Sequence, residues 1–516
     1  MKAKLSFLLV FISWFAFSQI EEKKLDELVQ NTLKTFDVPG ISVGIIKDGN
    51  IIYSKGFGVR SLTTNQEMTD ETLVGIASNS KSFTATALAI LADEGKLNFD
   101  DKVSLYIPEF QMYDPYVSQE ITIKDLLTHR SGLGLGQGDL MFFPEGGTLT
   151  INEIIHNVRY LKPENSFRNK LDYNNIMFIV AGEIIHRVSG LSWAEFIEQR
   201  IMKPVGMTAS FGSYNRAKAA NVSNIIDAHA PVNGKVVAIP HDWNETGNAA
   251  GGIISNIKDM TTWAAFLMNG FTTKEGKKLV TDKQIQQLWN LQIAMPVALK
   301  NLYESNFSGY GLGWFLTDVK GHKQVYHTGG LIGTVTQFIL IPDMKLGIVV
   351  LTNQQSGAAF NAISNTIKDS YLGFEDRNWL KMYGDRTAKK EAEFEKGKLE
   401  VFAKSEAFKK DKNNQIKNEQ ILGTYTDNWF GDVEILNEGK TLRILCKTSP
   451  RLKGELLPYS SNVMLLKWDD RSYDADIFVN FQFDENGKAQ GIKLKPISEI
   501  TDFSFDFEDL DLKKKE

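Results

Sequence analysis

The sequence predicts an α+β protein in which an antiparallel sheet is flanked by helices, a helical subdomain lies beside the sheet, and a small β-barrel follows at the C-terminal end. Three observations lead to this prediction. Strand-like patterns occur at 41–53 and return at 311–352, while helical patterns dominate the section 121–270 between them. Beyond residue 423, apolar and polar residues alternate in short runs. We therefore expect one sheet that combines distant parts of the chain, followed by a separate all-β domain.

The first strands and the first long helix follow from local patterns. Apolar residues alternate on either side of Asp48-Gly49-Asn50, which predicts a hairpin that pairs 41–46 with 51–53. From Ser78 to Gly95 the apolar residues recur at helical spacing, and Gly95 is a typical C-terminal stop. Ser78 is therefore expected at or just before the first turn of a buried helix.

The remaining elements of the first domain are predicted in the same way. Helices are expected at 122–129, 151–161 and 174–189, and strands at 311–317, 324–327, 334–341 and 346–352. Pro342-Asp343 marks the turn between the last two strands. Gly132, Gly134, Gly136 and Gly138 alternate strictly and follow no clear strand, so we interpret them as a flexible loop and a candidate rim of the functional site.

Four segments are predicted along the chain. Residues 1–18 carry two lysines, then an apolar run and small residues, which is typical of a secretory signal peptide and predicts an exported, periplasmic or secreted protein. The apolar run is shorter than the roughly 20 residues of a spanning helix, so we expect no transmembrane segment after cleavage. Residues 19–375 form the first domain, the charged stretch 376–418 a helical linker, and residues 419–516 the barrel domain. We expect residues 19–375 to fold without the remainder.

Composition narrows the function further. With 42% hydrophobic and 23% charged residues the chain is globular, and a net charge of −5 without a basic stripe argues against nucleic acid as a partner. The only cysteine, Cys446, excludes an intrachain disulfide and a cysteine-based metal site. The seven histidines show no paired metal spacing, so neither a metal nor another cofactor is expected; they are residues 129, 156, 186, 229, 241, 322 and 327.

Ser78 and Lys81 form a Ser-x-x-Lys pattern at the start of a predicted helix. This spacing places both side chains on one helix face, about one turn apart, so that a neutral lysine could take the serine proton. The helix N-terminus also leaves backbone N–H groups free to meet an oxyanion. Alone, the pattern is also consistent with a capping serine followed by a solvated lysine.

Two further motifs favour a catalytic role for Ser78 and Lys81. Tyr173-Asn174-Asn175 lies at the start of the helix predicted for 174–189, and His327-Thr328-Gly329-Gly330 lies at the end of a predicted strand. Each fragment alone is more often structural. The ordered set of three, however, resembles the signature of the serine penicillin-recognising enzymes, the family of class C β-lactamases and penicillin-binding proteins, in its Ser-x-x-Lys, Tyr-x-Asn and His-x-Gly form. The resemblance covers residues 22 to about 372.

The resemblance implies a β-lactamase/transpeptidase-like fold and a role for each motif residue. Ser78 would be the nucleophile, Lys81 its base and Tyr173 a second acid/base group. Asn175, His327, Thr328 and Gly329 would bind substrate, and the backbone N–H groups of Ser78 and Gly330 would form the oxyanion hole. The barrel domain resembles the lipocalin-like domain that follows the catalytic domain in some of these hydrolases, and self-association into a homo-oligomer is left open.

The substrate is expected to be a small molecule or peptide, and a peptidase or amidase acting on D-amino-acid or cell-wall-type peptides is favoured. A short-chain esterase or a β-lactamase of the same fold remains an alternative, as does a non-catalytic sensor or scaffold. Where many members carry lysine this chain has His327, which is mostly neutral at pH 7 unless a neighbour raises its pKa. We therefore expect substrates without a carboxylate beside the scissile bond, and a shift toward carboxylates as pH falls through the histidine titration.

Overall fold

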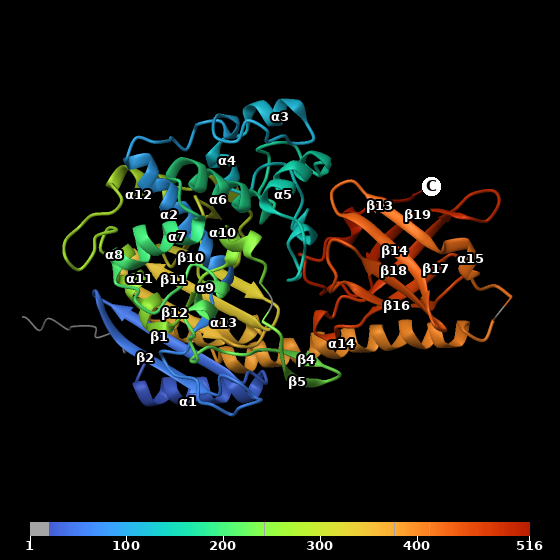
Figure 1. Ribbon diagram of the computed structural model, residues 1–516. Coiled ribbons are helices and arrows are strands. Elements are labelled where there is room, and N and C mark those ends of the chain that lie inside the picture. The colour runs from blue at the N-terminus through green and yellow to red at the C-terminus, as the bar shows by residue number, and fades with distance from the viewer. Residues whose placement is uncertain (1–19, 242, 376, 412, 516) are drawn as a thin grey trace, which may run out of the picture.

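A computed structural model describes residues 20–241, 243–375, 377–411 and 413–515. The predicted signal peptide, residues 1–18, lies outside the described residues. Figure 1 shows a larger α+β body built on a twisted sheet and a β-barrel beside it, with one long helix running below both. The predicted fold class is confirmed in its main parts, namely the antiparallel sheet, the flanking helices and the C-terminal barrel.

The central sheet is antiparallel in every pair and combines both ends of the first domain. Its strand order is β2-β1-β12-β11-β10-β9-β8-β7. The bounds are β1 Gly40–Lys47, β2 Asn50–Gly58, β7 Ile293–Met295, β8 Ser308–Tyr310, β9 Phe315–Val319, β10 His322–Leu331, β11 Thr334–Ile341 and β12 Leu346–Thr352. The pairing of β1 with β12, Ile41 opposite Thr352, joins the two distant strand regions as expected.

Helices cover both faces of this sheet because its central strands are apolar on both sides. Helices α1 (Glu22–Thr35) and α13 (Gly357–Leu372) pack on one face, in a cluster that contains Leu25, Val43 and Phe360. Helices α2 (Ser80–Asp93) and α11 (Ile257–Met268) pack on the other face, where the rings of Phe83 and Trp263 stack with centroids 4.1 Å apart. The start of α2 is therefore buried between the sheet and the helical subdomain.

The helical subdomain occupies the middle of the chain. Its α-helices are α3 Pro115–Glu120, α4 Ile123–Leu127, α5 Ile151–Asn157, α6 Ile176–Ser189, α7 Trp193–Ile197, α8 Lys203–Val205, α9 Tyr214–Ala219 and α10 Asn248–Gly251, and α12 (Asp282–Trp289) follows α11. Short 3-10 turns occur at η1 Ala77–Asn79, η2 Val103–Leu105, η3 Asp139–Met141, η4 Val158–Tyr160, η6 Glu245–Gly247 and η7 Pro342–Met344, and η5 (Glu198–Met202) is a π-turn. Two small ribbons pair β3 (Val74–Gly75) with β6 (Ile254–Ser255) and β4 (Ala228–Val232) with β5 (Lys235–Ile239).

One predicted strand is wrong. The stretch 311–317 is not a single strand, because β8 ends at Tyr310 and β9 begins at Phe315, with a tight turn between them. Gly313 in this turn has a φ of 76°, a left-handed conformation that favours glycine. A Cβ at this position would lie 2.9 Å from the carbonyl oxygen of Lys81, so the glycine also allows the turn to approach the start of α2.

The charged stretch after residue 376 forms one long helix, α14 (Trp379–Phe408). Its first residue, Trp379, is buried in the same cluster as α1 and α13, and its indole Nε1 donates to Asp369 at 2.7 Å. The first turn of α14 therefore belongs to the core of the first domain. The helix then runs beneath the barrel (Figure 1), where Ser405 Oγ donates to the carbonyl of Pro458 at 2.7 Å.

The C-terminal domain is a closed antiparallel barrel of eight strands, β13 to β20, preceded by α15 (Asn418–Ile421). The strands are β13 Gly423–Asp427, β14 Gly431–Glu438, β15 Thr441–Cys446, β16 Lys453–Pro458, β17 Val463–Trp468, β18 Ile477–Phe483, β19 Ala489–Pro496 and β20 Leu512–Lys514. Short turns η8 (Arg471–Tyr473) and η9 (Phe507–Asp509) complete it. The segment 497–511 between β19 and β20 leaves the barrel wall and reaches the first domain through Ser504 and Asp506.

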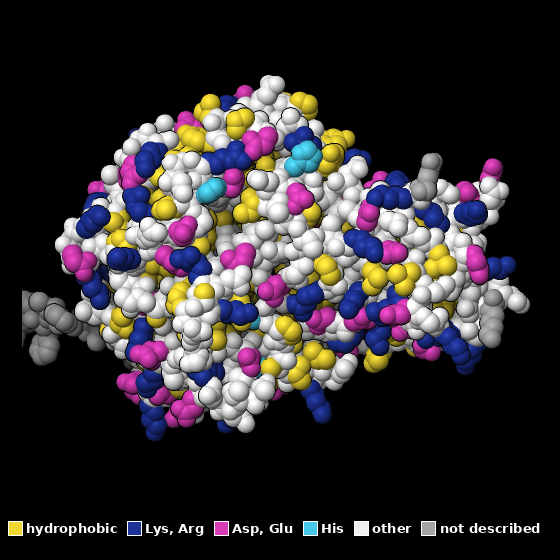
Figure 2. Space-filling view, in the orientation of Figure 1, with side chains coloured by type: hydrophobic (Ala, Val, Ile, Leu, Met, Phe, Trp, Pro, Cys, Tyr) yellow, Lys and Arg dark blue, Asp and Glu magenta, His cyan; other side chains and the backbone are white. Residues whose placement is uncertain are grey.

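Two surface properties bear on partners. On the face drawn in Figure 2, basic and acidic side chains are interspersed and form no continuous basic stripe. Among the described residues no single helix is long and apolar enough to cross a membrane. Together, α6 and the segment Trp193–Val205 have the length and composition of a membrane span, but they are bent by 72° relative to each other. Most side chains of α6 are buried in the core.

Candidate active site

Ser78 lies in the turn η1, directly before α2. The residue before it, Ala77, has a φ of 49°, an uncommon conformation for a side chain with a Cβ. Such a conformation is kept only where the surroundings hold it. Here the Ile76 amide donates to the carbonyl of Ile253 at 2.9 Å, and the Ile253 amide donates to Ser80 Oγ at 3.1 Å. The turn is thus fixed from both sides and presents Ser78 to a cavity.

Strands β10 and β11 hold the same turn from the sheet. Thr336 Oγ1 donates to the carbonyl of Ile76 at 2.9 Å and accepts from Asn79 Nδ2 at 2.8 Å. A Cβ at Gly329 would lie 2.3 Å from the carbonyl oxygen of Ile76, so only glycine allows β10 to lie this close to the turn. This gives Gly329 a packing reason in the His-x-Gly motif.

Lys81 is fully buried, and its amine reaches three oxygens. Nζ lies 3.0 Å from Ser78 Oγ, 2.7 Å from Asn175 Oδ1 and 2.8 Å from the carbonyl of Ala250. An amide oxygen and a carbonyl can only accept, so they take two N–H groups of the amine. A neutral amine has two N–H groups and one lone pair, which is then left to face the serine hydroxyl. The geometry suits a lysine that takes a proton from Ser78.

Electrostatics favour that neutral state. Burial lowers the pKa of Lys81 to about 7, although the nearby carboxyl of Asp139 raises it in part. A solvated lysine has a pKa near 10.4, so it would be protonated in nearly all molecules at pH 7. In this site a substantial fraction of the lysine is free to act as a base at neutral pH.

Tyr173 completes the group around Ser78. Its side chain hydrogen-bonds with Ser78, and its ring centroid lies 4.8 Å from Lys81 Nζ. Burial raises the pKa of the Tyr173 hydroxyl well above its usual range, so the phenol keeps its proton in the resting site. His129 packs on this ring with centroids 4.2 Å apart and accepts the Asn174 amide at 3.0 Å through Nδ1.

Asn175 links the lysine to a carboxyl that the sequence motifs did not reveal. Its Nδ2 donates to Asp139 Oδ2 at 2.7 Å, and Ser504 Oγ from the barrel donates to the same oxygen at 2.8 Å. Asp139 is fully buried, and burial raises its pKa to about 7 against the opposing effects of these two donors and of Lys81. Sequence reasoning missed both Asp139 and Ser504 because neither belongs to a motif and 365 residues separate them.

His327 is neutral and buried, not a charged anchor. Its Nδ1 lies 2.6 Å from the carbonyl of Thr328, which can only accept, so Nδ1 carries the proton. Nε2 then accepts the hydroxyl of Tyr310 at 2.9 Å. Burial and, to a smaller extent, the charge of Lys81 lower the pKa of His327 to about 3. The expected titration at mildly acidic pH is therefore wrong for this environment, because the imidazole stays neutral through that range.

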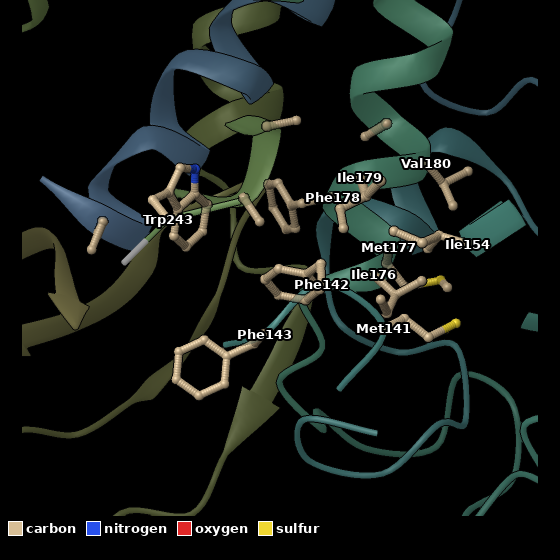
Figure 3. Close-up of a cluster of buried hydrophobic side chains, with 14 of the residues drawn as sticks. Met141, Phe142, Phe143, Ile154, Ile176, Met177, Phe178, Ile179, Val180 and Trp243 are labelled. Atoms are coloured by element: carbon tan, nitrogen blue, oxygen red, sulfur yellow. The ribbon is translucent and has the colours of Figure 1, made fainter. Parts of the chain in front are cut away.

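A cavity of about 430 Å³ opens at Ser78, and its walls are mainly aromatic and aliphatic. Its side chains come from several elements: Leu135, Phe142, Phe143, Leu171, Tyr173, Trp243, Met295, Phe315, Leu331, Ile332 and Phe503. Figure 3 shows Phe142, Phe143 and Trp243 near one another, beside the apolar side chains of α6. Thr328 and Gly330 line the same cavity, and a Cβ at Gly330 would meet nothing within 4 Å, so this position faces open space.

The barrel supplies one wall of the cavity. Asp502, Phe503 and Ser504 line it, and the Phe503 ring meets the Tyr173 ring edge to face with centroids 6.0 Å apart. The glycine-rich loop predicted as a rim does line the cavity, through Leu135. It is held in place, however, since the Gly136 amide donates to the carbonyl of Tyr173 at 2.9 Å.

Among the described residues that line this cavity there is no lysine or arginine, and the carboxyls are those of Asp172 and Asp502. Within the described part of the chain, no group of three or more His, Cys, Asp or Glu side chains is arranged to hold a metal ion. The site therefore offers a serine and a tyrosine in the wall of a mainly apolar cavity, with a buried lysine behind the serine.

Comparison with known proteins agrees with this architecture. A family model described as Beta-lactamase matches residues 25–371, and a model described as a domain of unknown function (DUF3471) matches residues 409–514. Two solved structures share the fold. The octameric penicillin-binding protein homologue from Pyrococcus abyssi has a TM-score of 0.62 at 22% identity and covers 96% of this chain and 100% of its own. A class C beta-lactamase has a TM-score of 0.55 at 21% identity and covers 69% of this chain and 96% of its own.

Curated relatives match the same region. "Unguisins hydrolase ungD'" of Aspergillus campestris is 27% identical over 377 residues, which are 70% of this chain and 67% of that protein. "Protein flp" of Staphylococcus aureus is 27% identical over 339 residues, 65% of this chain and 64% of that protein. The chain thus spans about two thirds of the length of these relatives. Because the matched family model covers more than half of the chain and includes both the central sheet and the serine turn, this protein belongs to the Beta-lactamase family.

Proposed function

We propose that this protein is a serine hydrolase that works through a Ser78 acyl-enzyme on amide or ester bonds of small, uncharged peptides or esters. The observation that carries the proposal is the buried Lys81 amine, whose two acceptors leave its lone pair facing Ser78 Oγ at 3.0 Å. An ordinary surface serine has no such base. Membership of the Beta-lactamase family, whose members are generally serine hydrolases, is consistent with this chemistry.

The proposed reaction has two halves. Lys81 takes the Ser78 proton as Oγ attacks the substrate carbonyl carbon, and the backbone N–H groups of Ser78 and Gly330 hold the resulting oxyanion. When the tetrahedral intermediate collapses, the bond to the leaving group breaks and Tyr173 hands it a proton, which Lys81 replaces. Water then attacks the acyl ester, loses a proton to the same pair of groups, and releases the acid with Ser78 restored.

A protonated Tyr173 is compatible with amide as well as ester substrates. An amine leaves only when it is protonated, whereas an alkoxide or phenoxide leaves more readily. The raised pKa of Tyr173 keeps a proton beside Ser78 for this purpose. We propose a peptidase or amidase first, with D-amino-acid or cell-wall-type peptides as its substrates, and a short-chain esterase second.

The cavity supports uncharged substrates. Its volume of about 430 Å³ falls within the usual range for small-molecule sites, and its walls are apolar. A carboxylate beside the scissile bond would find a neutral His327 and no cationic side chain among the lining residues. β-Lactams and carboxypeptidase substrates carry such a carboxylate, so we place them behind neutral amides. Export to the periplasm or outside the cell is part of the proposal and rests on the sequence of residues 1–18.

Labelling of the purified protein by a fluorophosphonate tests the proposal. Ser78 is expected to be modified, and Ser78→Ala should abolish labelling, while Ser80→Ala, which loses its bond to the Ile253 amide but keeps the nucleophile, should still be labelled, although more slowly. Unlabelled protein is assayed separately on D-amino-acid peptides, nitrophenyl esters and a chromogenic cephalosporin. Labelling that survives Ser78→Ala would refute the assignment, and a protein with neither labelling nor turnover would be the non-catalytic alternative.

A further inference from the structure

The turn that carries Asp139 is held by the barrel and not by its own domain alone. Asp506, from the segment between β19 and β20, accepts the Gly138 amide at 2.6 Å and the Leu140 amide at 3.0 Å. Ser504 donates to Asp139 itself at 2.8 Å. Both barrel residues are buried. Three hydrogen bonds from one short barrel segment therefore fix the position of this carboxyl.

Asp139 is in turn two hydrogen bonds away from the proposed base. Asn175 presents its oxygen to the Lys81 amine and its nitrogen to the Asp139 carboxyl. A flip of the amide group would place its NH2 against the Lys81 amine, which is also a donor, so this orientation is fixed. Asp139 Oδ1 has no hydrogen-bond partner among the described residues. A negative charge on this carboxyl is thus stabilised at only one of its oxygens in a site away from water, which makes the ionised form costly.

We propose that Asp139 is a positioning residue that sets the protonation state of Lys81, and that the barrel takes part in this control through Ser504. The proposal rests on the function proposed for Ser78 and Lys81. In the resting site a protonated Asp139 places no negative charge near Lys81, so the lysine is neutral in a larger fraction of molecules than it would be beside an ionised carboxyl. The barrel would then be part of the catalytic machinery and not only a wall of the cavity.

The charges around the pair determine the direction of each effect. Asp139 faces Lys81 of α2, Tyr173, and the barrel carboxyls Asp502 and Asp506. Two histidines, His129 and His327, also lie near Lys81, but burial lowers the pKa of both, so they are neutral at the pH of the assay. Lys81 is then the cation whose charge acts on Asp139, and an ionised Asp139 favours the protonated, inactive lysine.

Substitution of Asp139 is therefore expected to activate the base at low pH. Asp139→Asn keeps the shape and the acceptor but removes the charge, so the pKa of Lys81 falls. Below neutral pH, kcat/KM and the rate of Ser78 labelling fall as Lys81 becomes protonated; we call this part of each pH profile the acid limb. In Asp139→Asn the acid limb should move to lower pH by about one unit. Ser504→Ala removes one donor that favours the ionised carboxyl, so its limb should move in the same direction by a smaller amount. A purely structural role would lower the plateau and leave the limb in place.

The matched controls are Asp259→Asn and Ser210→Ala. Asp259 is also a buried carboxyl that accepts a serine hydroxyl, from Ser210 at 2.7 Å, but unlike Asp139 it is not bonded to Asn175 and is not among the charges that act on Lys81. These controls should leave the acid limb unchanged. If Asp139→Asn does not fold, Ser504→Ala decides the matter. An acid limb that stays in place or moves to higher pH in the folded variant overturns the proposal.

An infrared measurement separates this inference from the proposed function. The difference spectrum of native protein minus Asp139→Asn, recorded as a function of pH, should show the carbonyl band of a protonated carboxyl near neutral pH. This signal does not depend on turnover. Loss of Ser78 labelling with the band present contradicts the function, whereas labelled Ser78 with no band at any pH above 5 contradicts the role of Asp139.

Discussion

The rate of acylation is expected to fall tenfold per pH unit below pH 7, because only the neutral form of Lys81 can take the Ser78 proton. With a pKa of about 7, the neutral fraction of Lys81 is half at pH 7. It is about nine tenths at pH 8 and about one tenth at pH 6. An unperturbed lysine, with a pKa near 10.4, would be neutral in less than about 1% of molecules at pH 8, and its rate would still be rising at pH 10.

The structure also limits which other groups could produce this limb. His327 has its pKa lowered to about 3 and His129 has its pKa lowered well below the usual value, so neither titrates near 7. Asp139 titrates in the same range as Lys81, so the apparent value belongs to the pair. Burial also raises the pKa of Asp502 in the cavity wall, so a limb near pH 7 is assigned to the lysine and its coupled carboxyl where Lys81→Met removes it.

The measurement is kcat/KM for an uncharged ester between pH 5 and 10 at constant ionic strength. Fluorophosphonate labelling of Ser78 over the same range gives a second reading that does not depend on deacylation. Lys81→Met should lower the plateau by about 10²- to 10⁴-fold, the range that general bases contribute. A rate that is flat from pH 5.5 to 9, or that keeps rising through pH 10, would refute the assignment of Lys81 as a neutral base.

Two further substitutions test the cavity. His327→Lys places a cation where the imidazole is neutral. It should improve kcat/KM for a carboxylate-bearing substrate about tenfold relative to its uncharged ester analogue. In the native protein the ratio of the two kcat/KM values should stay constant from pH 5 to 8, and a native preference for the carboxylate at pH 8 would contradict this account. Phe503→Ala should raise KM for a substrate with an aromatic acyl group about tenfold, since an edge-to-face ring contact with its buried area is worth about 1.5 kcal/mol. KM for an acetyl substrate should change little. Phe307→Ala is the control, because Phe307 is similarly exposed, 36% against 41%, but does not line the cavity; equal effects of the two variants would argue against a substrate contact at Phe503.

Local patterns predicted the elements where burial is regular. The strands expected at 334–341 and 346–352 match β11 and β12 at every residue, because both are rich in β-branched and apolar residues and Pro342-Asp343 marks the turn between them. The strand at 51–53 extends to Gly58 as β2, since an edge strand with one exposed face tolerates Ser54 and Lys55 without apolar alternation. The strand at 311–317 failed because Gly311 and Gly313 form a turn whose tightness depends on contact with α2, which no local pattern contains.

The residues of the candidate site also fall into two groups, those that local motifs predict and those that only the fold brings together. Ser78, Lys81, Tyr173, Asn175 and His327 belong to short motifs, and the structure brings all five together. Asp139 and Ser504 meet only because the barrel lies against the first domain. One sequence feature could have drawn attention to the barrel segment: Phe503, Phe505 and Phe507 alternate with Ser504 and Asp506 outside any predicted hairpin. Aromatic rings that alternate with polar groups in a loop indicate a packed contact and not a free connection.

The contact between the barrel and the first domain bears on the predicted domain boundary at residue 375. A chain that ends at residue 375 loses Trp379, which is 2% exposed and hydrogen-bonded to Asp369, so the cut removes part of the first domain's own core. A chain that ends after Phe408 keeps this tryptophan but still loses Phe503, Ser504 and Asp506. The backbone amides of Gly138 and Leu140 then lose their acceptor, and Asp139 loses a donor. We therefore expect independent folding to need the start of α14 and a complete active site to need the barrel, so that the two are separate properties of this protein.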